Sequence, residues 1–236
     1  MTPEVIVVPD GLALADMAAE RIEDLAVAAT PLVPATISLA GGSTPRKAYQ
    51  RLGSRCAPWA RLRIFFGDER CVPPEDEGSN YRMVREALLD RVPLLPEQVH
   101  RIPGELEPDD AAAAAEADLR AEFPDVTTPR LDLCVLGIGV DGHTASLFPG
   151  GPELDAADRL MVPVHRPELP QPWRVSMTLR LINASRRVMF VADDAAKAEV
   201  VARAIAGDAG IPAGRVRPDS GNVTWIITEA TAAKLT

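Results

Sequence analysis

The sequence predicts an α/β fold in which a mainly parallel sheet carries helices on both faces, in three layers. Short apolar runs alternate with helical patterns from one end of the chain to the other, which is typical of strand–helix–strand units. The apolar runs lack a clean in–out alternation, which indicates strands buried on both faces. The chain has 236 residues, of which 47% are hydrophobic and 25% charged. These values suit one globular domain over residues 1–236 with a sizeable core.

The predicted strands are short runs rich in β-branched, aromatic and other apolar residues. In chain order they lie at 4–8, 36–40, 62–66, 99–102, 131–137, 174–179, 186–192 and 223–228. A Pro-rich stretch at 163–173 is the least regular segment, because its prolines disfavour helix. We interpret it either as a seam to a small second subdomain or as a loop over the site.

The helical patterns lie between these strands, and local signals mark where several of them begin. Helices are expected at 12–28, from Thr44, from about residue 79, at 109–122 and at 194–206. Asp10, Thr44 and Ser79 are predicted N-caps, because their side-chain oxygens can accept from N–H groups of the first turn. Pro45 suits a first turn, whose N–H groups need no helical partner. The run of alanines at 111–115 is a good helix former.

Charge and cysteine content exclude several function classes. The net charge is −9, so we expect neither nucleic acid nor an anionic membrane as a partner. The longest apolar runs, such as Leu133–Val140, are far too short to span a bilayer. The first residues, 1–11, lack the basic start of a signal peptide, so a cytoplasmic location is expected. Cys56, Cys71 and Cys134 form no C-x-x-C pair and are expected to be reduced, with Cys134 a core residue.

The segment SLAGGSTPRKAY at 38–49 places two glycines and two hydroxyls between a strand end and a helix start. Backbone N–H groups and the helix dipole make such a place an anion site. A Walker loop is excluded by the spacing. A plain glycine turn with an N-cap explains this segment equally well. Arg174 and Lys197 could face the same anion, although each alone is more often a surface charge.

The segment GIGVDGHTASLFPGG at 137–151 contains a formal G-x-G-x-x-G pattern directly after a strand. Pro149 and the glycines behind it cut short the helix that a dinucleotide site would need. His143 remains, in a glycine-rich loop at the carboxyl end of a strand, where open α/β sheets place their sites. A histidine titrates near neutrality and can act as a general base. We favour that role over a histidine that merely caps the loop.

The segment at 65–82 runs from a strand into a polar loop that begins with Asp68, Glu69 and Arg70. An arginine at a strand end can bind anionic oxygens, and neighbouring carboxylates can orient it or bind hydroxyls. A solvated turn with local ion pairs is the alternative. The chain has no H-x-x-x-H pattern and no cysteine cluster, so no metal is predicted.

Four motifs occur in order along the chain: SLAGGSTP, FFGDERCVPPEDEGSNYRM, LDLCVLGIGVDGHTASLFPG and PWRVSMTLRLIN. Together with AKAEVV and NVTWIITEATA, this set resembles the glucosamine-6-phosphate isomerase/6-phosphogluconolactonase family, and within it the lactonases, over essentially the whole chain. The resemblance implies a Rossmann-like fold in a single domain. It also implies hydrolysis of 6-phospho-D-glucono-1,5-lactone to 6-phosphogluconate in the oxidative pentose phosphate pathway, without a cofactor.

Two features separate the chain from the deaminases of the same family. The deaminase pattern after the histidine typically runs I-A-F-N-E-P, whereas here Thr144–Pro149 reads TASLFP. The deaminase Asp-Glu-Tyr is replaced by Asp68, Glu69 and Arg70. RVSMTL stands where RVTLT is more usual in lactonases, and Val140 where proline is common. A non-catalytic sugar-phosphate-binding module is the remaining alternative, and the retained histidine loop argues against it.

The lactonase resemblance leads to an expected role for each candidate residue. His143 would take a proton from the water that attacks C1, and Arg70 or a loop N–H would stabilise the carbonyl oxygen. Asp68 would hold Arg70 or a sugar hydroxyl, and Asp141 would position the loop. The expected ligands of the 6-phosphate are Gly41, Gly42, Ser43, Thr44, Arg174 and Lys197. We expect a monomer whose partner is a small phosphosugar lactone.

Overall fold

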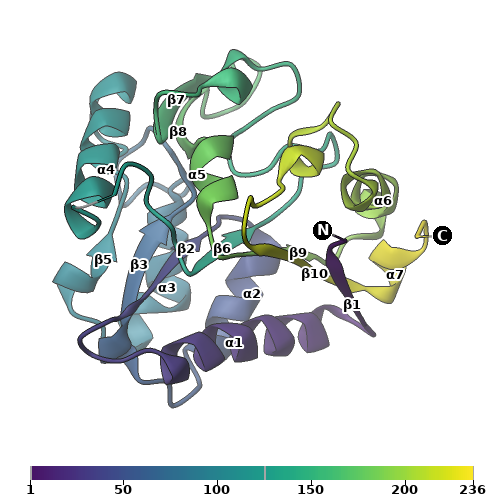
Figure 1. Ribbon diagram of the computed structural model, residues 1–236, viewed down its shortest axis with the longest axis horizontal. Coiled ribbons are helices and arrows are strands. Elements are labelled where there is room, and N and C mark those ends of the chain that lie inside the picture. Colours follow the sequence, from purple (N-terminus) through teal and green to yellow (C-terminus); the bar gives the residue numbers. More distant parts are fainter. Residues whose placement is uncertain (1, 125, 236) are drawn as a thin grey trace.

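The strands of the computed structural model, which describes residues 2–124 and 126–235, form one seven-stranded parallel sheet and one three-stranded antiparallel sheet (Figure 1). The order of the large sheet is β1-β10-β9-β6-β2-β3-β5. In chain order its strands are β1 Glu4–Val8, β2 Ala35–Leu39, β3 Leu62–Phe66, β5 Val99–His100, β6 Leu133–Leu136, β9 Arg187–Ala192 and β10 Asn222–Thr228. The predicted α/β fold with a parallel sheet is confirmed.

The helices cover this sheet on both faces. They are α1 Gly11–Ala28, α2 Ser43–Leu52, α3 Asn80–Ala87, α4 Pro108–Glu122, α5 Leu179–Ala184, α6 Ala198–Ala206 and α7 Glu229–Ala232. In Figure 1, α1 and α2 lie below the sheet, and α5 and α6 lie above it. No helix of the described ranges combines the length and the apolar content that a membrane crossing needs.

The small antiparallel sheet consists of β4 Asp68–Arg70, β8 Trp173–Met177 and β7 Met161–His165, in the order β4-β8-β7. The expectation of an irregular segment at 163–173 is therefore wrong at both of its ends, which belong to β7 and β8. Pro163 is tolerated because β7 is an edge strand, where a missing N–H costs no ladder hydrogen bond. The strand predicted at 174–179 also belongs to this sheet and not to the large one.

Two of the three predicted N-caps are confirmed. The Asp10 carboxylate accepts from the N–H groups of Leu12 and Ala13, each at 2.9 Å. The Ser79 hydroxyl accepts from the N–H of Arg82 at 3.1 Å.

The prediction for Thr44 is wrong, because α2 begins one residue earlier and its N-cap is Gly42. Gly42 has a φ of 106°, in the left-handed region that favours glycine. The Thr44 hydroxyl is thereby turned away from the helix end and donates to the Asp193 carboxylate. The helix predicted at 194–206 begins as a 3₁₀ turn at Ala195–Lys197 and continues as α6.

Two separate hydrophobic clusters hold the molecule together. The larger one fills the space between the parallel sheet and its helices, and it includes Cys134, as predicted. The smaller one contains Phe148, Val162 and Val164 and lies with the antiparallel sheet. All three cysteines are free. Met161, Val175 and Met177 of the small sheet also belong to the larger cluster. The small sheet therefore packs both on the main core and on a cluster of its own.

Candidate active site

A cavity of about 260 Å³ opens at the carboxyl ends of β2, β6 and β9, beside β4 and β8. Most of the residues singled out in the sequence line it, although they come from five separate segments of the chain. They are Gly41, Gly42, Ser43, Thr44, Asp68, Arg70, His143, Arg174 and Lys197. Asp141 contacts His143 at its edge. The structure thus brings together all the candidate residues.

His143 is paired with Asp141 through its ring. The Nδ1 atom lies 2.6 Å from Asp141 Oδ1, and the same oxygen accepts from the His143 backbone N–H at 3.1 Å. Partial burial would raise the pKa of Asp141, but the hydrogen bonds from His143 and its charge outweigh burial and hold that pKa below its ordinary value of 3.8. An ionised carboxylate only accepts, so Nδ1 carries a proton, and in the neutral ring Nε2 is the nitrogen with the lone pair.

The His143 ring is confined on two sides. A Cβ atom at Gly139 would lie 2.1 Å from ring atoms Cε1 and Nδ1, so only glycine leaves room there. The ring of Phe148 packs against the imidazole, with centroids 4.6 Å apart. Gly139 is thus explained by the histidine that packs on it, and Gly142 by its positive φ of 87°.

The N-terminus of α2 presents backbone N–H groups to the cavity. Among the described residues, the N–H groups of Gly41, Gly42 and Ser43 have no backbone acceptor, as an anion site requires. The Thr44 hydroxyl is taken by Asp193, so Thr44 can offer an anion only its backbone N–H.

Asp193 also accepts from Lys47 Nζ at 2.8 Å. Partial burial would raise the pKa of Asp193, but hydrogen bonds from Lys47 and Thr44 and the charges of Lys47 and Lys197 lower it. This carboxylate therefore stays ionised at neutral pH and ties α2 to the chain that follows β9.

Arg70 and Arg174 stand opposite each other in the β4–β8 ladder. Arg70 Nη1 donates to the carbonyl of Gly78 at 2.7 Å and to Asn80 Oδ1 at 2.6 Å. The Nε atoms of both arginines are buried, and neither finds a partner in the described part of the chain. Burial and the Arg70 guanidinium lower the pKa of Arg174, against the opposing charges of Asp68 and Glu69. Two neighbouring cations with unused donors favour an anionic or strongly polar ligand.

Asp68 does not contact Arg70 directly, and Asn80 joins the two. The Asn80 amide donates to Asp68 Oδ1 at 3.2 Å while its oxygen accepts from Arg70. Asp68 Oδ2 accepts from the Ser146 hydroxyl at 2.6 Å. Asp68 is buried, so it fixes the β4 segment and the histidine loop relative to each other.

Glu69 is also buried, and it excludes the interpretation of 68–70 as a solvated turn. Its carboxylate accepts from the backbone N–H groups of Arg70, Asn80 and Tyr81 and from the Ser79 hydroxyl. Burial raises the pKa of Glu69, and these hydrogen bonds oppose the rise. The loop that follows β4 is thereby folded back onto the strand, which holds Arg70 in place.

Sequence reasoning missed Asn80, Ser146, Phe148 and Asp193 as parts of the site. Asn80 directly follows the predicted N-cap Ser79, and Ser146 and Phe148 lie in the histidine motif. The sequence therefore marked the segments in which these residues stand, but it did not indicate which side chains they contact. Asp193 carried only the weak signal of an acid just after a strand. Cys71 is not a reactive thiol, since burial and Glu69 raise its pKa to about 11.

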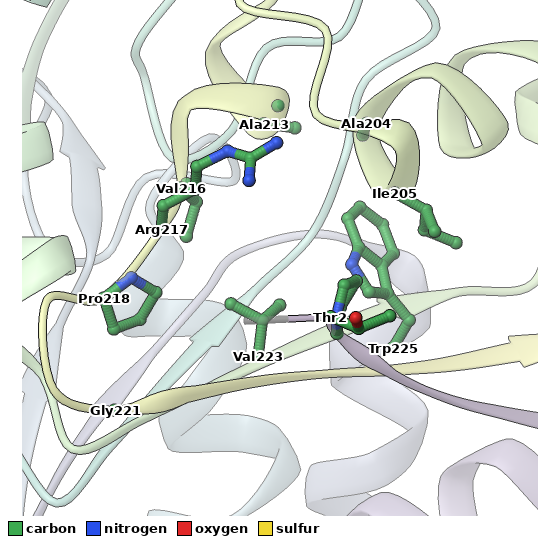
Figure 2. Close-up of a pocket in the computed structure, with 12 residues that line it drawn as sticks. Thr2, Ala204, Ile205, Ala213, Val216, Arg217, Pro218, Gly221, Val223 and Trp225 are labelled. Atoms are coloured by element: carbon green, nitrogen blue, oxygen red, sulfur yellow. The ribbon is translucent and has the colours of Figure 1, made fainter.

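Two other hollows of the described surface have no histidine in their lining. A cavity of about 90 Å³ lies between β10, α6 and the turn Pro212–Arg215. Figure 2 shows its mainly apolar lining around Trp225, with Arg217 as the charged side chain. A wider hollow of about 310 Å³ lies at the amino ends of β9 and β10, the opposite edge from the one where open α/β sheets bind ligands. Within the described ranges no group of three or more His, Cys, Asp or Glu side chains could hold a metal ion.

Comparison with known proteins shows what the chain as a whole is similar to. A sequence model described as "Glucosamine-6-phosphate isomerases/6-phosphogluconolactonase" matches residues 9–225. A 6-phosphogluconolactonase of Homo sapiens is 36% identical over 96% of this chain and 90% of its own length. One of Streptomyces coelicolor is 34% identical over 99% of this chain and 95% of its own length. The solved 6-phosphogluconolactonase of Trypanosoma cruzi superposes with a TM-score of 0.88, at 31% identity, over 99% of this chain and 97% of its own.

Proposed function

The chain belongs to the family of glucosamine-6-phosphate isomerases and 6-phosphogluconolactonases, and we propose that it hydrolyses 6-phospho-D-glucono-1,5-lactone through a water molecule activated by His143. The activity itself, that of a lactone hydrolase in the pentose phosphate pathway, follows from its lactonase relatives. The roles of the residues are our proposal.

The pairing of His143 with Asp141 beside a cationic cavity is the observation that carries the mechanism. Asp141 holds the proton on Nδ1, so Nε2 is the basic nitrogen. The carboxylate would also stabilise the imidazolium that forms when Nε2 takes a proton. The arrangement therefore supplies a general base with a fixed tautomer and orientation.

The reaction needs one water molecule and one histidine. As water attacks C1 of the lactone, one of its protons passes to His143 Nε2, and an oxyanion forms on the carbonyl oxygen. The bond between C1 and the ring oxygen then breaks, and the imidazolium returns the proton to that oxygen. The product is an open-chain acid with a free hydroxyl. Positioned general-base catalysis generally contributes ~10²–10⁴ in rate.

The cationic groups of the cavity have two separate proposed roles, which are binding of the phosphate and stabilisation of the oxyanion. Arg70, anchored by Asn80 and the Gly78 carbonyl, would stabilise the carbonyl oxyanion. The N-terminus of α2, Arg174 and Lys197 would hold the 6-phosphate. Binding energy from this remote group would then orient C1 toward His143.

The first test measures turnover of freshly generated 6-phosphogluconolactone by acid release above the spontaneous rate. We expect His143→Ala to lower kcat by ~10²–10⁴-fold and to leave the binding of 6-phosphogluconate intact. His165→Ala, which changes an exposed histidine outside the cavity, should retain wild-type kcat. Wild-type kcat in His143→Ala would contradict the general-base role. Ammonia release from glucosamine 6-phosphate would instead assign the site to a deaminase.

A further inference from the structure

We propose that Phe148 and Arg166, held by Glu153, position the imidazole of His143, so that the loop of the β7–β8 hairpin takes part in catalysis without touching the substrate. This inference rests on the role proposed above for His143. None of the three residues lines the cavity, so they would act through the histidine.

The first contact that supports this proposal is between Phe148 and His143. The ring centroids lie 4.6 Å apart with an angle of 33° between the planes, and Phe148 is only 9% exposed. Asp141 fixes Nδ1, the ring packs closely over Gly139, and Phe148 is a third neighbour that limits rotation of the imidazole. A shift of the phenyl ring would therefore move Nε2 relative to C1 of the substrate.

The second contact fixes the phenyl ring. The guanidinium carbon of Arg166 lies 4.9 Å from the centroid of Phe148, within the range of a cation–π interaction. Arg166 also forms an ion pair with Glu153, and the two side chains are only 15% and 5% exposed. A Cβ atom at Gly151 would lie 2.2 Å from both partners, so the chain leaves room for this pair. Burying two charged side chains is costly unless they are paired. Removal of either Arg166 or Glu153 would leave the other as an unpaired buried charge, which would no longer be held in place.

The third observation is that this assembly belongs to the small sheet. Phe148 packs with Val162 and Val164 of β7, and with Leu169 of the loop that follows, in a cluster separate from the main core. The Arg166 backbone N–H donates to the Pro172 carbonyl at 2.7 Å, which closes the hairpin loop. In Figure 1 the hairpin stands apart from the parallel sheet that positions the loop of His143. The position of the phenyl ring is thus set by the hairpin.

The test compares Phe148→Leu and Arg166→Gln with Val188→Ala. Val188 is a buried residue of β9 in the main cluster, so its truncation controls for lost stability alone. We expect kcat to fall on the order of 10²-fold in Phe148→Leu and about tenfold in Arg166→Gln, because small displacements of a catalytic group cost rate. KM should stay within about twofold in Arg166→Gln, because the Arg166 side chain lies against Phe148 and Glu153 and not against the phosphate ligands. A larger rise in KM is expected in Phe148→Leu, since the Arg174 guanidinium carbon lies 5.9 Å from the centroid of the Phe148 ring. Val188→Ala should retain kcat at temperatures where it is folded.

A spectroscopic readout makes the inference independent of activity. The chain has three histidines, and the ring resonances of His143 can be assigned in a ¹H–¹³C spectrum by their loss in His143→Ala. Arg166→Gln keeps the phenyl ring, so a changed ring-current shift of His143 would report that the ring has moved. We expect such a change in Arg166→Gln and none in Val188→Ala.

The outcomes separate this inference from the proposed function. If His143→Ala is inactive while Arg166→Gln and Phe148→Leu keep wild-type kcat, the inference is overturned and the lactonase mechanism stands. If His143→Ala remains active, the general-base role fails, and the His143 resonances still decide whether Arg166 positions the ring. Unchanged resonances in Arg166→Gln would overturn the inference in either case.

Discussion

Arg70 and Arg174 place two positive charges next to each other, which destabilises the fold but suits the binding of an anion. Like charges directly opposite each other in an antiparallel ladder are destabilising. Here both side chains are partly buried, and the Nε atom of each has no hydrogen-bond partner among the described residues. A bound phosphate or developing oxyanion would relieve this repulsion. The pair is therefore better explained by ligand binding than by stability.

Arg174→Ala should raise KM about ten- to a hundredfold with little change in kcat, because a hydrogen bond to a charged group contributes ~1.5–3 kcal/mol. Steady-state kinetics on the lactone would measure both constants. Arg187→Ala removes an exposed arginine at the far end of β9 and controls for the change in net charge. A fall in kcat at unchanged KM would place Arg174 at the reacting carbonyl instead.

The place of a residue in the site could be predicted from the sequence where a local motif directly follows a predicted strand of the parallel sheet. His143 stands in a glycine loop after a strand, and parallel strands share one carboxyl edge, so its place in the site followed. The link between Asp68 and Arg70 could not be predicted, because Asn80 makes it from the start of another element. The packing of Phe148 on His143 also depends on how β7 folds back. Contacts of this kind depend on tertiary distances that spacing does not encode.

At the scale of elements, the parallel sheet was predictable and the antiparallel sheet was not. Uninterrupted apolar runs mark buried strands, as in β6 with LCVL and β9 with VMFVA. β4 has only three residues, two of them acidic, and β7 contains Pro163, so neither has the composition of a strand. Both strands are stabilised by pairing with β8, which is distant in sequence from β4 and follows β7 in a hairpin.

The tie between α2 and the end of β9 yields a prediction at this scale. Asp193→Ala removes the acceptor for Thr44 and Lys47, and its side chain is only 13% exposed. We expect the free energy of unfolding to fall by about 1.5–3 kcal/mol. KM should rise, because the anion-binding end of α2 is no longer fixed. Urea unfolding and steady-state kinetics would measure these effects.

Asp193→Asn is the matched variant for that experiment. It keeps one oxygen that can accept from Thr44 but loses the charge and the second acceptor oxygen, which Lys47 uses. Its KM should therefore lie between those of the wild type and Asp193→Ala. If Asp193→Ala loses stability while its KM is unchanged, the tie supports the fold and does not order the anion site.

At the scale of the whole molecule, the two sheets must keep a fixed relation, because the active site takes residues from both. α4 packs against β7 and β8, and Glu116 makes the polar link. Its carboxylate accepts from the N–H groups of Leu160 and Met161 at 2.8 and 3.2 Å and from Arg120 Nη2 at 2.7 Å. Loss of this link would weaken the attachment of the sheet that carries Arg174.

Glu116→Gln tests the link through its pH dependence. Partial burial would raise the pKa of Glu116, but the N–H groups of Leu160 and Met161 and the Arg120 guanidinium lower it below its ordinary value of 4.5. A carboxyl group whose pKa is lower in the folded than in the unfolded protein stabilises the fold at pH values above its unfolded-state pKa. This stabilisation is lost as the pH falls through its folded-state pKa. At pH 7 the variant should therefore be less stable than the wild type by about 1–3 kcal/mol in urea unfolding. The difference should shrink as the pH falls below 4.5.

Glu97→Gln, at an exposed position, should match the wild type throughout. A deficit in Glu116→Gln that stays constant with pH would show that its geometry, and not its charge, joins the two sheets.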